Sequence, residues 1–81
     1  MSTKAQQNQK YRVIPGFLRE MREKAKLTQR EMGERLNKPQ SYVHNCETAN
    51  RRVDITEFIQ WSIACGIDPK KAFAKLLKEL S

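Results

Sequence analysis

The sequence lacks the features that mark several large classes of protein. No apolar run exceeds a few residues and residues 1–12 are polar, so we expect neither a membrane-spanning helix nor a secretory signal. With one histidine, no glycine-rich phosphate loop and no clustered nucleophile and base, the chain is not expected to be an enzyme. No useful stretch alternates polar and apolar residues, so strands are not expected. A small all-α binding domain remains.

Cysteine is scarce, and its two copies are poorly placed for metal or disulfide chemistry. Cys46 and Cys65 belong to no CxxC pair and to no histidine cluster. His44 would point about 200° away from Cys46 on a helix, so the two cannot form a catalytic pair. We therefore expect two buried free thiols, no metal and no cofactor, in a protein of the reducing cytoplasm.

Acidic residues are outnumbered by basic ones. Sixteen Lys and Arg face nine Asp and Glu, which gives a net charge of +7 and a pI of about 9.8. Residues 1–12 hold three of the basic residues and no acid, so residues 13–81 still carry +4. We expect residues 1–12 to be a flexible basic arm and residues 13–81 to be one domain attracted to polyanions.

Apolar spacing predicts a compact fold of five short helices, each of which must bury its apolar stripe on the others. The expected helices cover about residues 15–25, 28–36, 40–48, 55–65 and 69–80. The residues expected to face the core from the fourth helix are Ile55, Phe58, Ile59 and Ile63.

Residues typical of helix ends support these boundaries. Thr28 with Glu31, and Asp54 with Glu57, have the spacing of capping boxes, which start helices. Asn37 suits a left-handed helix end. The sequence therefore predicts a sharp turn between the second and third helices, where Pro39 follows.

The third helix has an unusual polar face. At steps of about 100° per residue, four neutral hydrogen-bonding side chains fall on one side of it. They are Gln40, Ser41, His44 and Asn45. Such groups can read base edges in the major groove of DNA, although a solvated helix surface is the simpler alternative. The short helix, turn and second short helix favour DNA, because together they have the form of a helix-turn-helix unit.

Groups suited to phosphate flank this face. Gln29 and Arg30 stand at the amino end of residues 28–36, where free amides and the helix dipole favour anions. Lys38 lies in the turn, and Arg51 and Arg52 follow the third helix. Their placement on both sides of residues 40–48 favours phosphate contacts over ordinary surface charge.

The stretches LREMREKAKLTQREMGERL, SYVHNCETANRRVD and IACGIDP together resemble the lambda-repressor-like helix-turn-helix family, of the Cro/C1 or XRE type. The resemblance covers residues 18–77. It implies that residues 40–48 are the recognition helix and that its four polar residues contact bases.

The resemblance also implies roles for four other residues. Gln29 matches a glutamine that bonds a phosphate and braces the first residue of the recognition helix. Tyr42 falls where phosphate contact or support is common. Arg22 and Glu47 match a structural ion pair that ties the first helix to the end of the third.

Three residues depart from the family pattern. Lys26 replaces a glycine, so the left-handed turn there is expected to be reshaped or strained by about 1 kcal/mol. Ala49 replaces another glycine, which leaves the path of residues 48–52 open. Gly33 replaces an alanine and is expected to pack similarly while weakening its helix by about 1 kcal/mol.

The expected function is sequence-specific binding of double-stranded DNA as a transcription regulator, most simply a repressor. A protein-interaction module that uses the same fold is the alternative. Specific affinity normally needs two half-sites, so we expect a homodimer on a palindromic operator and no small-molecule ligand. The candidate interface residues, each of which could instead belong to the monomer's core, are Trp61, Phe73, Leu77 and Leu80.

Overall fold

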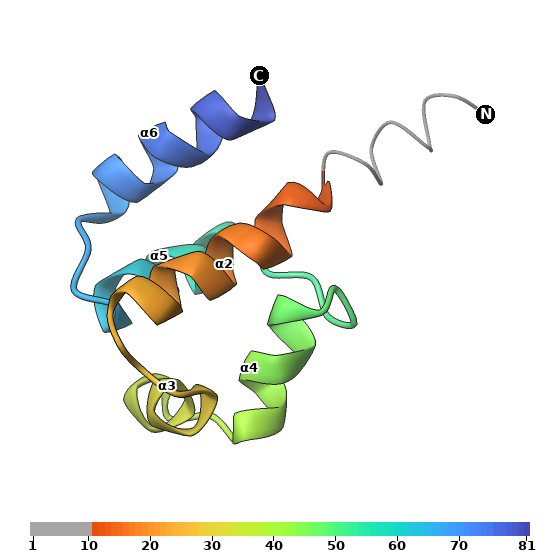
Figure 1. The fold of residues 1–81 in the computed structure, drawn as a ribbon, viewed down its shortest axis with the longest axis vertical. Helices are drawn as coiled ribbons and strands as arrows, with labels where there is room; N and C mark the ends of the chain where they lie inside the picture. Colours follow the sequence, from red (N-terminus) through yellow and green to blue (C-terminus); the bar gives the residue numbers. More distant parts are fainter. Residues whose placement is uncertain (1–10) are drawn as a thin grey trace.

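The computed structural model describes residues 11–81, which form five α-helices and no strand (Figure 1). The expected all-α class is therefore confirmed. Residues 1–10 of the expected arm lie outside the described part of the chain. The helices are α2 (Val13–Lys24), α3 (Gln29–Leu36), α4 (Gln40–Glu47), α5 (Ile55–Ala64) and α6 (Pro69–Leu80).

Both expected capping boxes form. The Thr28 hydroxyl accepts a hydrogen bond from the Glu31 amide at 3.0 Å, and the Glu31 carboxylate accepts one from the Thr28 amide at 2.9 Å. Asp54 and Glu57 make the same reciprocal bonds at 2.8 and 2.9 Å. These bonds satisfy amides that have no partner inside the helix, and so they fix where α3 and α5 begin.

Three helices end in the same left-handed turn. Its central residues are Lys26 after α2, Asn37 after α3 and Gly66 after α5, with φ angles of 62°, 58° and 75°. After α2, the Leu27 amide donates to the Arg22 carbonyl at 3.2 Å and the Lys26 amide to the Glu23 carbonyl at 2.9 Å. This pair of bonds is a Schellman motif. The turn at Lys26 therefore keeps its left-handed form without glycine.

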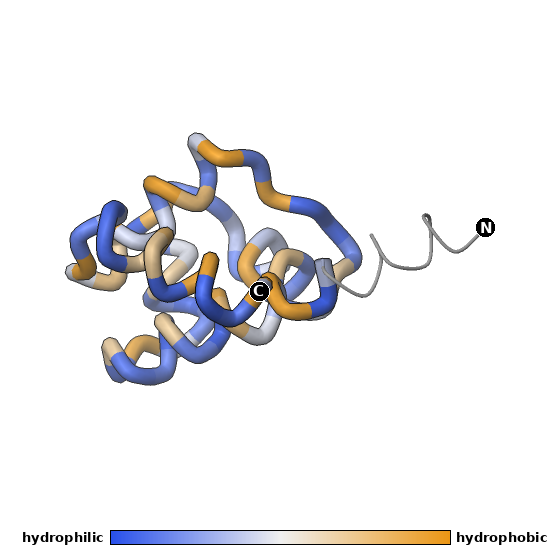
Figure 2. The backbone as a smooth tube through the Cα atoms, turned by 90° about the horizontal axis from the view of Figure 1, so that it is seen from above, coloured by the Kyte–Doolittle hydropathy of each residue, from blue (hydrophilic) through white to orange (hydrophobic). Residues whose placement is uncertain are grey.

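The core is built from the inner faces of all five helices. Leu18, Met32, Val43 and Trp61 are fully buried, and α6 adds Leu76. The Trp61 indole nitrogen donates to the Leu18 carbonyl at 3.1 Å, so its polar atom is satisfied inside the core. Figure 2 shows apolar and polar residues alternating along the helical tube, the pattern of amphipathic helices. Among the candidate interface residues, Trp61 thus belongs to the core.

Helix α5 presents a different face to the core from the one expected. Phe58 is buried, but Ile55, Ile59 and Ile63 are 59%, 40% and 62% exposed. Two helical stripes overlap in this sequence, and the inward one runs through Phe58, Trp61, Ser62 and Cys65. The inward stripe buries the indole ring completely and lets its N–H reach the Leu18 carbonyl, and the isoleucines therefore face outward.

Both cysteines are buried free thiols, as expected. Burial raises the pKa of the Cys65 thiol to about 11 and also raises the pKa of the Cys46 thiol. At neutral pH both therefore remain protonated and behave as small apolar side chains.

Helix α2 lies between the two ends of the molecule, with α6 on one side and α3 and α4 on the other (Figure 1). Within residues 11–81 no helix is long and apolar enough to cross a bilayer.

Candidate nucleic-acid interface

The turn between α3 and α4 is shaped by Gly33, Asn37 and Pro39. Asn37 reverses the chain in the left-handed conformation, and Pro39 then occupies the N-cap position of α4 without a side-chain capping bond. A Cβ atom on Gly33 would lie 2.7 Å from the Lys38 carbonyl oxygen. Alanine at this position therefore needs the turn to move, and the expectation that the two residues pack similarly is wrong. The close approach of α3 to this turn depends on glycine.

The four polar residues of α4 form one accessible face, here called the recognition face: Gln40, Ser41, His44 and Asn45. Asn45 is partly exposed and the other three are exposed, while Val43 and Cys46 behind them are fully buried. Within residues 11–81 none of these four side chains forms a hydrogen bond. Their donors and acceptors are therefore available to a ligand.

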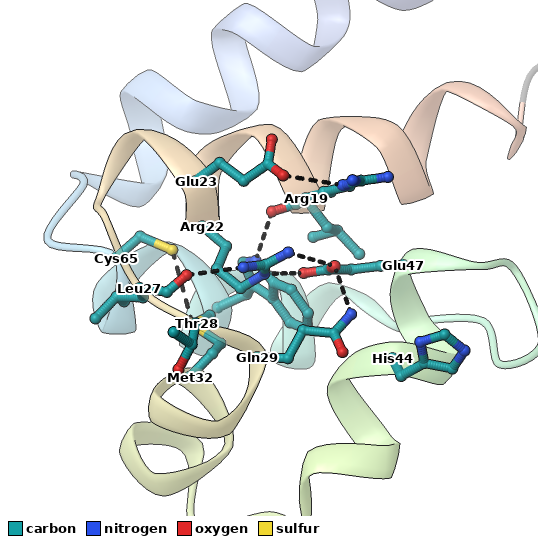
Figure 3. A network of polar contacts seen from close by, with 12 residues as sticks. Arg19, Arg22, Glu23, Leu27, Thr28, Gln29, Met32, His44, Glu47 and Cys65 are labelled. Atoms are coloured by element: carbon teal, nitrogen blue, oxygen red, sulfur yellow. Dashed lines mark hydrogen bonds and ion pairs between the residues drawn. The ribbon is translucent and has the colours of Figure 1, made fainter.

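The inner end of α4 is held by a buried ion pair (Figure 3). The Nη2 atom of Arg22 donates to Glu47 Oε1 at 3.0 Å, and Nε donates to Oε2 at 2.6 Å. The two side chains are 10% and 2% exposed, and the bond to Glu47 raises the pKa of Arg22. Arg22 also donates to the Leu27 carbonyl at 2.7 Å. This pair connects α2, the turn after it and the last residue of α4.

Gln29 joins the same network. Its side-chain nitrogen donates to Glu47 Oε1 at 3.1 Å, so Gln29 braces the last residue of α4, whereas the resemblance implied the first, Gln40. His44 lies outside this network in Figure 3. The bracing side of α4 and the recognition face are therefore separate surfaces of one short helix.

Three of the expected phosphate-binding residues meet around one ring. The ring of Tyr42 is partly buried, with Lys38 Nζ at 5.3 Å and Arg51 Cζ at 4.9 Å from its centre. Both distances suit cation–π contact. Burial is the largest of the effects that raise the pKa of Tyr42, so its hydroxyl remains a neutral donor. Arg30, at the start of α3, is exposed.

Arg51 and Arg52 have different surroundings. Arg51 forms a fork with Glu57, with nitrogen–oxygen distances of 3.0 and 2.9 Å. Arg52 Cζ instead lies 4.4 Å from the centre of the Tyr11 ring. The Tyr11 hydroxyl accepts a hydrogen bond from the Val53 amide at 2.9 Å, which fixes the loop beside Arg52.

Sequence reasoning missed Tyr11 and the pairing role of Glu57. Tyr11 stands at the end of a polar segment, which predicts an arm, and its partner Val53 lies 42 residues away. Arg51 and Glu57 are six residues apart across a loop, a spacing that no helical pattern marks. Only the path of the loop, where Ala49 adopts a φ of 67°, brings them together.

Among residues 11–81 no group of three or more His, Cys, Asp or Glu could hold a metal ion. Every buried side-chain polar atom there has a hydrogen-bond partner.

Two short helices joined by a tight turn, with an accessible polar face on the second and basic groups on both sides, define the helix-turn-helix class of DNA-binding domains. A family model described as a helix-turn-helix domain matches residues 16–71. The chain is also similar to a solved structure, an XRE-family like protein from Pseudomonas syringae pv. tomato str. DC3000. The two share 37% identity and a TM-score of 0.86, over 96% of this chain and 95% of that one.

The chain therefore belongs to the XRE-type helix-turn-helix family and is, in general terms, a DNA-binding regulator. No curated protein matches it.

Proposed function

We propose that this domain binds double-stranded DNA in a sequence-specific way and regulates transcription in the cytoplasm, most simply as a repressor that occludes a promoter. The observation that carries the proposal is the recognition face, whose four neutral polar side chains are accessible and form no hydrogen bond with any residue of 11–81. Gln and Asn can bond adenine through two atoms, Ser can bond several bases, and His can donate to guanine. Helix α4 would lie in the major groove.

Basic and polar groups around α4 support a phosphate-binding role. Gln29 and Arg30 stand at the amino end of α3, where the helix dipole attracts anions. Lys38 and Tyr42 lie at the start of α4, and Arg52 follows its end. We assign these five residues to the DNA backbone, which fixes the register of α4 without reading sequence.

A second copy of the chain completes the proposed site. The exposed large hydrophobic residues of the described chain gather on α5 and α6, and this set is here called the apolar face: Ile55, Ile59, Ile63, Phe73 and Leu77. Ile55, Ile59 and Ile63 are four residues apart, so they form a ridge that can pack against its symmetry mate. A two-fold dimer through this face would present two copies of α4 to a palindromic operator.

Selection of random duplexes on the purified protein tests the proposal. We expect a palindromic site to emerge, and we expect Asn45→Ala to weaken binding to it by about 1–3 kcal/mol in a mobility-shift assay. Selection without any sequence preference would favour a protein-interaction module instead, and so would an affinity for DNA that is the same in Asn45→Ala as in the wild type.

Arg52→Ala separates phosphate contact from base reading. It should weaken binding to all duplexes alike and reduce the slope of log affinity against log salt by about one unit. Lys75→Ala is the matched control, because it removes the same charge from α6, which lies across α2 from α4 (Figure 1). Its salt slope should equal that of the wild type.

A further inference from the structure

Arg51 and Arg52 are adjacent, basic and exposed, yet their guanidinium groups are differently occupied. Both terminal nitrogens of Arg51 contact the Glu57 carboxylate, at 3.0 and 2.9 Å, and Nη1 also donates to the Arg52 carbonyl at 3.0 Å. Among residues 11–81 no carboxylate pairs with Arg52. The donors of Arg52 are therefore available to a phosphate, whereas those of Arg51 already serve a carboxylate.

Arg51 also connects two helices. Its backbone amide donates to the Asn45 carbonyl at 3.1 Å, in the last turn of α4, and its guanidinium lies against the ring of Tyr42 on the same helix. Glu57 belongs to the first turn of α5 and closes the capping box there. Through Arg51, the outer side of α4 is thus tied to the start of α5.

The inner side of α4 already has its own tie through Glu47 to Arg22 and Gln29. Val43 and Cys46 also bury this eight-residue helix against the core. The contacts of Arg51 with Tyr42, the Asn45 carbonyl and Glu57 add a further attachment, which restricts small rotations of α4 about its axis.

We propose that Arg51 is a positioning residue for specificity: paired with Glu57, it sets the orientation in which α4 presents its recognition face. Of the two arginines, only Arg52 then contacts phosphate. This inference rests on the proposed function. It refines the expectation from the sequence, in which both arginines contact phosphate.

The variant that tests the proposal is Glu57→Gln. Glutamine can still accept the amide bond of a capping box, so the start of α5 is kept, but it carries no charge to hold Arg51. We expect the ratio of specific to nonspecific DNA affinity to fall roughly fivefold, the factor for one lost hydrogen bond. The salt slope should stay at the wild-type value, because no phosphate contact is lost.

Arg51→Lys provides a second, independent variant. Lysine keeps the positive charge but cannot form the two-nitrogen fork with Glu57. It should therefore lower the same specificity ratio without changing the salt slope.

The opposite results would overturn the inference. If Glu57 merely competes with a phosphate for Arg51, Glu57→Gln will bind DNA more tightly and its salt slope will steepen by about one unit. An unchanged specificity ratio in both Glu57→Gln and Arg51→Lys would also overturn it. Wild-type protein that selects no duplex would instead overturn the proposed function, and this inference with it.

Discussion

At the scale of single residues, Gly16 and Gly33 both lie inside helices but have opposite surroundings. A Cβ atom on Gly16 would meet nothing within 4 Å, whereas one on Gly33 would meet backbone at 2.7 Å. Gly16→Ala should raise the free energy of unfolding by about 0.5–1 kcal/mol, because alanine is the better helix former. Gly33→Ala should lower it by about 1 kcal/mol, since the displaced turn outweighs that gain. Urea unfolding of both variants checks this, and equal stabilisation would contradict it.

Lys26 occupies a left-handed conformation that costs a side chain about 1–2 kcal/mol. Lys26→Gly removes most of that strain, so we expect the free energy of unfolding to rise by about 1 kcal/mol. Lys26→Ala is the control, because it removes the same charge and keeps the strained Cβ. Thermal unfolding should show a gain for glycine alone; a similar gain for alanine would attribute the effect to charge.

Residue identity predicted helix ends better than it predicted side-chain partners. Thr28, Asn37 and Asp54 act through backbone groups within a few residues, so their roles follow from local sequence. The partner of Gln29 is Glu47, eighteen residues away. Whether Gln29 contacts the last or the first residue of α4 depends on how α3 packs against α4, which local sequence does not reveal.

At the scale of elements, the attachment of α4 through Glu47 is the contact with the largest expected effect on stability. Glu47→Gln would leave the buried Arg22 charge without its partner, and we expect the free energy of unfolding to fall by about 3 kcal/mol. Glu23→Gln is the matched control, because its pair with Arg19 is 54–63% exposed and should contribute less than about 1 kcal/mol. Chemical unfolding should show a clearly larger loss of stability in Glu47→Gln than in Glu23→Gln. Comparable losses in the free energy of unfolding would show that the buried pair stabilises the fold no more than the exposed one.

The helix caps predict an acid-sensitive stability. Bonds from Arg51 and then from the Asp54 amide hold the pKa of Glu57 below its ordinary value of 4.5, and the Thr28 amide lowers the pKa of Glu31. A carboxyl with a depressed folded pKa stabilises the fold fully above its unfolded pKa and loses that contribution as pH falls through the folded pKa. The free energy of unfolding should therefore decline below about pH 4.5, and Glu57→Gln should flatten this decline. Unfolding curves at pH 3–6 test both expectations, and an equally steep decline in the variant would exclude Glu57 as a source.

The orientation of α5 could not be predicted from its sequence. Two apolar stripes coexist there, and periodicity alone does not choose between them. The choice depends on which stripe meets α2, where the Leu18 carbonyl receives the indole N–H of Trp61. That partner is 43 residues away, outside any local window.

At the scale of the whole molecule, the outward isoleucines predict an assembly state. Ile59→Lys places a charge in the apolar face and should abolish dimerisation, because a buried unpaired ammonium is strongly unfavourable at an interface. Gln60→Lys adds the same charge at the exposed neighbouring residue outside that face and should leave the dimer intact. Light scattering with and without operator measures the difference, and a dimeric Ile59→Lys protein would rule out this interface.

The class of the molecule was predictable because several short-range signals agree on it. The two capping boxes join residues three apart, the turn follows from residues 37–39, and the outward polar side of α4 comes from residues 40–45. The path of the loop at residues 48–52, which the sequence left open, and the outward direction of the isoleucines of α5, which it placed in the core, depend on contacts between segments far apart in the sequence.

The separation of the two sides of α4 has a consequence for how such a protein can change. Its anchoring carboxylate and its four outward side chains share no bond, so exchanging the latter costs the fold almost nothing. New target preferences are thus open to this chain by stepwise drift, and a library randomised at those four positions should yield folded proteins with altered operators.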